Sequence, residues 1–122
     1  MLSKNNRLKT KSAFAFTYKN GNVVFSNIIT LYAGKNKLDK NCPTRVGFVV
    51  SKKVHKRAVK RNRIKRLMRE NVRLMFKNNE ADILNNYQSL IFFAKPQILD
   101  KNIYEIRNTI LILLNKLANK KN

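Results

Sequence analysis

Residues 45–78 read RVGFVVSKKVHKRAVKRNRIKRLMRENVRLMFKN, a strand pattern followed by a helix pattern. Residues 45–51 are mostly β-branched and apolar, which predicts a largely buried strand. From Arg57 to about Asn78, apolar residues recur at the spacing of an amphipathic helix. At about 100° per residue they fill one arc of roughly 160°. The members of this apolar arc are Ile64, Leu67, Met68, Val72, Leu74 and Met75.

The polar side of the predicted helix is almost entirely cationic. Ten of the twenty residues at 51–70 are Lys or Arg, and Glu70 is the only acid among them. Cations recur at every fourth position from Arg57 to Arg73, with no acid in that row. Because like charges at this spacing destabilise an isolated helix, the row favours an external anion. The polar arc holds Arg61, Asn62, Lys65, Arg66, Arg69 and Arg73.

The whole chain shares this charge. It has 27 Lys and Arg against 6 Asp and Glu, a formal net charge of +21 in 122 residues. Self-repulsion of this size opposes a compact fold, whereas each phosphate neutralised on a polyanion adds affinity by releasing counterions. Six of the nine Arg residues lie between positions 57 and 73, and Arg has a planar fork that matches phosphate. The composition therefore indicates a nucleic-acid partner.

Size and composition predict a single domain, residues 1–122, with residues 1–8 and 118–122 flexible. Hydrophobic residues make up 43% of the chain, too many for a disordered basic tail. The N-terminus has no apolar signal segment, and the longest apolar run, 110–114, is far shorter than a bilayer span. Cys42 is alone and cannot form an internal disulfide, which is typical of a reducing compartment. We therefore expect a cytoplasmic protein that does not bind membranes.

Shorter patterns predict the remaining elements. Residues 9–20 favour a short helix that ends at Asn20-Gly21, and residues 103–117 have the apolar spacing of a C-terminal helix. Residues 34–44 are polar and favour a loop. The other three strands are expected at 23–25, 28–33 and 89–95. The order αβββαβα predicts an α+β sandwich, in which helices cover a four-stranded sheet.

The loop and the basic helix also contain a specific motif. Ser51-Lys52-Lys53 is followed by Arg61-Asn62-Arg63, Lys65-Arg66 and Arg69-Glu70. This segment closely resembles the signature of the protein subunit of bacterial ribonuclease P, in which the triplet is called the RNR motif. Matching residues elsewhere are Arg7-Leu8-Lys9, Tyr32, Arg45-Val46-Gly47 and Phe93-Ala94-Lys95-Pro96. One departure is the loop at 54–57, which is one residue longer than the Gly-containing form of many relatives.

The resemblance implies a ribonucleoprotein enzyme that removes the 5′ leader from precursor tRNA. In that family a large RNA performs catalysis with Mg²⁺ ions, and the protein is an accessory subunit without catalytic residues or metal ligands. The implied partners are the catalytic RNA and precursor tRNA, with no obligate protein partner. The implied fold is ribosomal S5 domain 2-like. Its crossover from the third strand through the basic helix to the fourth strand is left-handed, whereas general rules favour a right-handed one.

The resemblance assigns two groups of residues to RNA. Those expected to bind the catalytic RNA are Lys56, Arg57, Lys60, Arg61, Asn62, Arg63, Lys65, Arg66 and Arg69. Those expected to line a cleft for the leader are Arg7, Lys9, Phe14, Tyr18, Tyr32, Ser51, Lys52 and Lys53. Aromatic stacking beside a basic groove is how proteins generally hold single strands. Two alternatives stay open: Arg63 lies near the edge of the apolar arc and could bond within the protein, and the aromatic residues could be core.

Other functions fit the sequence less well. A non-catalytic RNA-binding module, such as a ribosome component, matches the charge and size but not the ordered motif or the aromatic first helix. A self-sufficient protein nuclease usually needs clustered acids or a His, and this chain has one His and six scattered acids. Cys42 has no Cys or His neighbours at zinc spacing, so no metal site is predicted. A membrane-active helix is disfavoured because the rest of the chain forms a full α/β domain.

Overall fold

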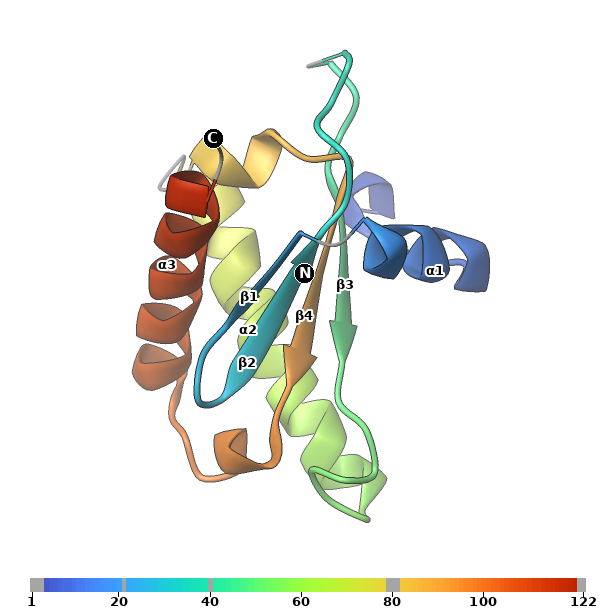
Figure 1. Cartoon of the computed structure of the whole chain (residues 1–122). Coiled ribbons are helices and arrows are strands. Elements are labelled where there is room, and N and C mark those ends of the chain that lie inside the picture. Colours follow the sequence, from blue (N-terminus) through green and yellow to red (C-terminus); the bar gives the residue numbers. More distant parts are fainter. Residues whose placement is uncertain (1–3, 21, 40, 79–81, 121–122) are drawn as a thin grey trace.

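The computed structural model describes residues 4–20, 22–39, 41–78 and 82–120 (Figure 1). Its helices and strands are α1 (Lys11–Lys19), β1 (Asn22–Phe25), β2 (Ile29–Ala33), β3 (Arg45–Val49), α2 (Ala58–Lys77), β4 (Ser89–Ala94) and α3 (Ile103–Lys120). The predicted αβββαβα order and four-stranded sheet are confirmed. Short 3-10 turns at 4–6, 82–85 and 96–98 were not predicted. Gly21, the expected stop of the first helix, lies outside the described residues.

The four strands form one sheet in the order β1-β2-β4-β3. β2 is antiparallel to both β1 and β4, whereas β3 runs parallel to β4. The two parallel strands are connected through α2. In Figure 1, α2 lies behind the sheet, and the chain passes from β3 on the right, through α2, to β4 on its left. This connection is left-handed, as the resemblance implied and against the general preference.

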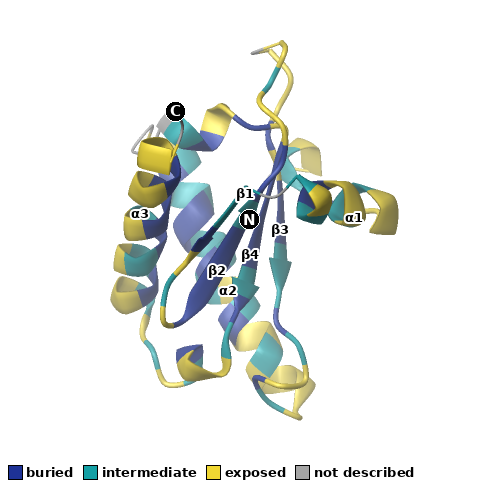
Figure 2. Ribbon diagram, in the orientation of Figure 1, coloured by how far each residue is buried: buried dark blue, intermediate teal, exposed yellow. Residues whose placement is uncertain are grey.

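One face of the sheet is buried beneath α2 and α3, which also contact each other (Figure 2). Leu31 of β2 and Phe92 of β4 lie fully buried at its centre. The apolar arc predicted for the basic helix is the surface that covers them, because Ile64, Met68, Val72 and Met75 are buried and Leu67 and Leu74 are half-buried. Burial of each such side chain contributes about 1.5–3 kcal/mol to folding. α2 is thereby fixed with its cationic side outward.

The opposite face of the sheet is covered only in part, by α1. The Thr10 hydroxyl accepts a hydrogen bond from the Ala13 N–H and caps the start of this helix. Thr17 faces the sheet, where its hydroxyl lies 2.6 Å from the hydroxyl of Ser89 in a buried contact. Tyr32 and Phe93, further along this face, are only half-buried. This partly open face therefore remains accessible to a ligand.

Both edges of the sheet are partly covered. At β1, the ammonium groups of Lys116 and Lys120 each donate a 2.8 Å hydrogen bond, to the carbonyl oxygens of Phe25 and Val23 respectively. At β3, the N–H of Leu8 donates to the carbonyl oxygen of Val46 at 3.0 Å. Exposed edge strands invite pairing with other chains, and lysines or covering segments are common ways to prevent it.

The chain ends were expected to be flexible at 1–8 and 118–122. In the described part of those segments, residues 4–6 form a 3-10 turn, Leu8 is buried and α3 continues to Lys120. Residues 1–3, 121 and 122 lie outside the described residues. Their flexibility stays a prediction.

Candidate nucleic-acid interface

The outward side of α2 presents most of the residues predicted to bind the catalytic RNA. Arg61, Lys65 and Arg69 are half-buried at the border between this side and the rest of the protein. The more exposed members are Lys56, Arg57, Lys60, Asn62, Arg63 and Arg66. Since the apolar arc anchors the helix to the sheet, these cations can meet phosphates without any change in the fold.

Arg61 is engaged within the protein. Its Nη1 donates hydrogen bonds to the backbone carbonyl oxygens of His55, at 3.0 Å, and Lys56, at 2.6 Å. Nδ1 of His55 in turn accepts from the N–H of Arg57 at 3.0 Å. Arg61 therefore stabilises the loop that precedes α2, in addition to any contact that it makes with RNA.

The sequence left open whether Arg63 bonds within the protein or contacts RNA. Arg63 is exposed, and its side chain has no hydrogen bond with any described residue. A signal for Arg61 was present in the sequence. At about 100° per residue Arg61 falls between Met68 and Val72, inside the edge of the apolar arc.

The last cation of the every-fourth-residue row has an acidic partner. Arg73 donates from Nη2 to Oε1 of Glu70 at 2.6 Å and from Nε to Oε2 at 3.1 Å. This hydrogen-bonded pair lowers the pKa of Glu70 below its ordinary value. The four cations of this row from Arg57 to Arg69 therefore still favour an external anion, whereas Arg73 is neutralised by Glu70 of the same helix.

The loop before α2 has a defined path despite its extra residue. The Ser51 hydroxyl accepts from the N–H of Lys53 at 3.3 Å, and the Ser51 carbonyl oxygen accepts from the N–H of Val54 at 3.0 Å. Val54 is buried, so it anchors the loop to the core. Lys52 and Lys53 are left exposed at the turn, beyond the end of β3.

The aromatic residues predicted for the leader cleft lie on the partly open face of the sheet. Tyr18 and Tyr32 pack edge-to-face, with ring centroids 4.7 Å apart. Burial raises the pKa of Tyr18, and neighbouring Tyr32 raises it further. Phe14 covers Gly47, since a Cβ at that glycine would lie within 2.6 Å of its ring. All three aromatic side chains are half-buried, so they form a surface beside the core, not the core itself.

Phe93 belongs to the same surface but was not predicted as part of the site. Its ring centroid lies 6.4 Å from that of Tyr32, again edge-to-face. In the sheet register Phe93 pairs with Thr30, two residues from Tyr32 on the same face. Period-two alternation would have identified Phe93 once the pairing of β2 with β4 was known.

The two predicted surfaces meet at the outer edge of β3. A pocket of about 230 Å³ there is lined by Arg7, Leu8, Phe14, Val46, Gly47, Phe48, Lys65 and Arg69. Arg7 and Phe14 come from the predicted leader cleft, whereas Lys65 and Arg69 come from the basic helix. The Arg69 guanidinium also lies 6.0 Å from the ring centroid of Phe48. Lys9, Tyr18 and Tyr32 are not part of this pocket.

Two further findings concern alternative functions. Among the described residues, no group of three or more His, Cys, Asp or Glu side chains is arranged to hold a metal ion. Within the same part of the chain, no helix is both long and apolar enough to cross a bilayer.

Comparison with known proteins identifies the family. The family model for Ribonuclease P matches residues 2–118. The chain belongs to the ribonuclease P family. It is 34% identical to the ribonuclease P protein component of Alkaliphilus metalliredigens, over 95% of this chain and 96% of that one. It is 38% identical to the same component from Alkaliphilus oremlandii, over 92% and 90% of the two chains.

Solved structures of the ribonuclease P family agree with the fold. The RNase P protein of Staphylococcus aureus superposes with a TM-score of 0.73 at 33% identity, over 92% of this chain and 94% of that one. Membership in this family connects the chain to a tRNA-processing ribonucleoprotein and gives it RNA as a partner.

Proposed function

We propose that this chain is the protein component of a ribonuclease P ribonucleoprotein and binds two RNAs at once. The basic side of α2 holds the catalytic RNA, and the aromatic face holds the 5′ leader of precursor tRNA. The protein thereby assists the endonucleolytic removal of the leader that gives the mature tRNA 5′ end. We place this activity in the cytoplasm, without an obligate protein partner.

The observation that carries the proposal is the pocket at the edge of β3. Lys65 and Arg69 reach it from the basic helix, and Arg7 and Phe14 reach it from the aromatic side. A cation can meet phosphate at this point while the Phe14 ring offers a face to a base. Because base stacking is worth about 1–3 kcal/mol per base and tolerates any sequence, this arrangement suits leaders of varied sequence.

The chemical step is assigned to the RNA. The chain has six acids and one His, too few and too scattered for general acid–base work or for a protein metal site. We assign the binding of Mg²⁺ to the catalytic RNA, and we propose none of the protein residues described above as a ligand of the ion. The protein contributes binding and orientation, since a leader held beside the catalytic RNA presents its cleavage site at high effective concentration.

Reconstitution tests the proposal. Purified protein should leave precursor tRNA intact at any Mg²⁺ concentration. Added to its cognate catalytic RNA at low Mg²⁺, it should increase site-specific cleavage. Cleavage by protein shown to be free of RNA would contradict the assignment of chemistry, and cleavage unaffected by the protein would contradict the assistance.

A charge-matched pair of variants tests the RNA-binding side. Alanine at both Arg66 and Arg69 should weaken assembly with the catalytic RNA and flatten its salt dependence by roughly 0.7–0.9 units per lost phosphate contact. Alanine at both Lys77, at the C-terminal end of α2, and Lys101 removes the same charge outside the predicted RNA-binding residues and should change the slope much less. Equal effects of the two variants would mean that the predicted RNA-binding residues act only through overall charge.

A further inference from the structure

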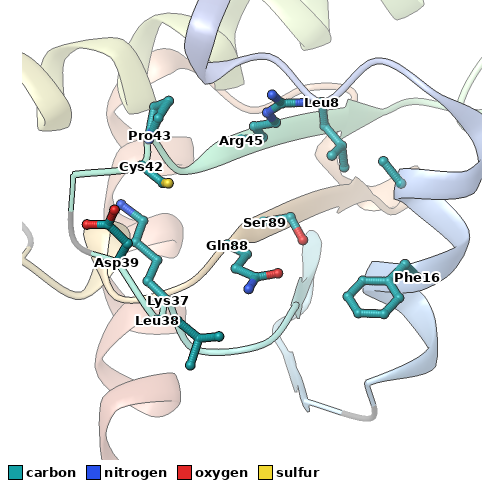
Figure 3. Close-up of a pocket in the computed structure, with 11 residues that line it drawn as sticks. Leu8, Phe16, Lys37, Leu38, Asp39, Cys42, Pro43, Arg45, Gln88 and Ser89 are labelled. Carbon is teal, nitrogen blue, oxygen red and sulfur yellow. The ribbon is translucent and has the colours of Figure 1, made fainter.

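The second flank of α1 borders a hollow that the proposed function does not use. On this helix Thr17 faces the sheet, Phe14 and Tyr18 lie on one flank, and Ala13 and Phe16 lie on the other. The hollow lies between that second flank and loop residues 37–39, 42 and 43, and its volume is about 350 Å³ (Figure 3). We call it the α1 hollow. Its lining comprises Leu8, Ala13, Phe16, Lys37, Leu38, Asp39, Cys42, Pro43, Arg45, Gln88 and Ser89.

The wall of the α1 hollow opposite the helix is held in place by backbone hydrogen bonds. The N–H of Gln88 donates to the carbonyl oxygen of Lys35 at 2.8 Å, and the N–H of Lys37 donates to that of Asn86 at 2.9 Å. These bonds attach the start of the 34–44 loop to the segment that leads into β4. This part of the wall is thus formed before any ligand arrives, which lowers the entropic cost of binding.

The chemistry of the α1 hollow matches that of a nucleotide. Phe16 exposes 46% of its surface, and the Lys35 ammonium lies 5.3 Å from its ring centroid. Arg45 is exposed, and its guanidinium has no hydrogen bond or ion pair with any described residue. Lys37 also lines the hollow, so its lining has two cations against one acid, Asp39, and Lys35 lies beside it at the Phe16 ring. An aromatic face beside unpaired cations is the combination that holds unpaired bases and their phosphates.

We propose that the α1 hollow is a second subsite for an unpaired RNA nucleotide, distinct from the leader cleft on the other flank of α1. The base lies against Phe16, and Arg45 binds a phosphate. Gln88, whose exposed amide lines the hollow, supplies a donor and an acceptor for the base edge. This inference rests on the proposed function, because RNA reaches the hollow only if the chain is bound to RNA.

The nucleotide can come from a long leader or from the catalytic RNA, and variants at Phe16 distinguish the two sources. Phe16→Ala removes the stacking face, Phe16→Tyr retains it, and Phe25→Ala is the matched control. Phe25 is 58% exposed and has the Lys95 ammonium 5.7 Å from its ring centroid, but it does not line the hollow.

The measurements are the affinity for the catalytic RNA, and the affinity of the reconstituted holoenzyme for precursor tRNAs with short and long leaders. Phe16→Ala should lose roughly 5- to 150-fold in one of these affinities, the equivalent of one stacked base. A loss confined to long leaders identifies the leader as the source, and a loss in assembly identifies the catalytic RNA. Phe16→Tyr and Phe25→Ala should remain near wild type, and the melting temperature of Phe16→Ala should be little changed.

Unchanged affinities of Phe16→Ala for every RNA would overturn the subsite, as would an equal loss in Phe25→Ala. A large fall in melting temperature with equal losses for all RNAs would also overturn it, because Phe16 would then act through folding. Wild-type protein that fails to assemble with the catalytic RNA would instead refute the proposed function, and the subsite with it.

Discussion

Replacing Gly47 with Ala should displace Phe14 from the leader cleft without altering Phe14 itself. A Cβ at Gly47 would lie 2.5 and 2.6 Å from two ring atoms of Phe14 and 3.3 Å from the Leu8 side chain. Ordinary van der Waals contact begins near 3.4 Å, so the ring must move by roughly 1 Å. The backbone of Leu8 is hydrogen-bonded to β3, so any relief on that side must come from rotation of its side chain.

The expected magnitudes follow from this clash. Overpacking costs about 1–3 kcal/mol of folding stability. Ala in a strand recovers about 0.5–1 kcal/mol relative to Gly, so the net loss should be modest. If Phe14 stacks on a leader base, its displacement should cost a further 1–3 kcal/mol, about 5- to 150-fold, in affinity for precursor tRNA. Mature tRNA, which lacks a leader, should bind as before.

A double-mutant cycle with Phe14→Ala isolates the effect. Once the ring is absent, the Ala at position 47 meets nothing closer than Leu8, so its effect on precursor affinity should disappear. Contacting residues typically show coupling energies of about 0.5–3 kcal/mol, and this pair should do so in both stability and precursor affinity. Additive effects of the two substitutions, or equal losses for precursor and mature tRNA, would refute the placement of Phe14 in the cleft.

Three further predictions concern α2 and its contacts. Arg61→Ala should speed amide exchange in the loop at 52–57, because two hydrogen bonds to its carbonyl oxygens are lost. Hydrogen–deuterium exchange measures this, and rates equal to those of wild type would contradict the role of Arg61 in stabilising the loop. Glu70 has a lowered pKa, so its pairing with Arg73 stabilises the fold above the unfolded-state pKa, and this contribution is lost as pH falls through the lower folded-state value. Melting temperature against pH should show a small acid-side loss that Glu70→Gln removes. Asn71→Ala should lower stability by about 1–3 kcal/mol in a denaturant titration, because the buried amide donates to the Ile103 carbonyl oxygen at 3.1 Å; an unchanged midpoint would argue against that bond.

Most of the fold was predictable because its signals are local. The apolar arc of α2 and the β-branched runs of the strands depend on sequence spacing alone, so those elements lie within a few residues of their predicted ends. The parallel pairing of β3 with β4 and the left-handed path through α2 are long-range features. Spacing carries no information about them, and only the family resemblance supplied the handedness.

The site was less predictable, because its geometry depends on contacts between distant segments. Phe14 covers Gly47, and Lys65 reaches the same pocket as Arg7, only because the N-terminal segment pairs with β3. The internal role of Arg61 was overlooked because its charge suggested solvent, although its position on the helical wheel indicated the protein side. Phe16 had no distinguishing pattern, since its neighbourhood is created by the 34–44 loop.

The lysines at the edge of β1 have a structural role besides their contribution to the net charge of +21. Lys116 and Lys120 each donate one ammonium proton to a carbonyl oxygen of β1 and keep their positive charge. Repulsion between copies of the free protein keeps the sheets apart, but that repulsion fades when RNA neutralises the surface. The hydrogen bonds of the two lysines do not depend on it. These bonds therefore disfavour strand addition at the β1 edge whether or not RNA neutralises the surface.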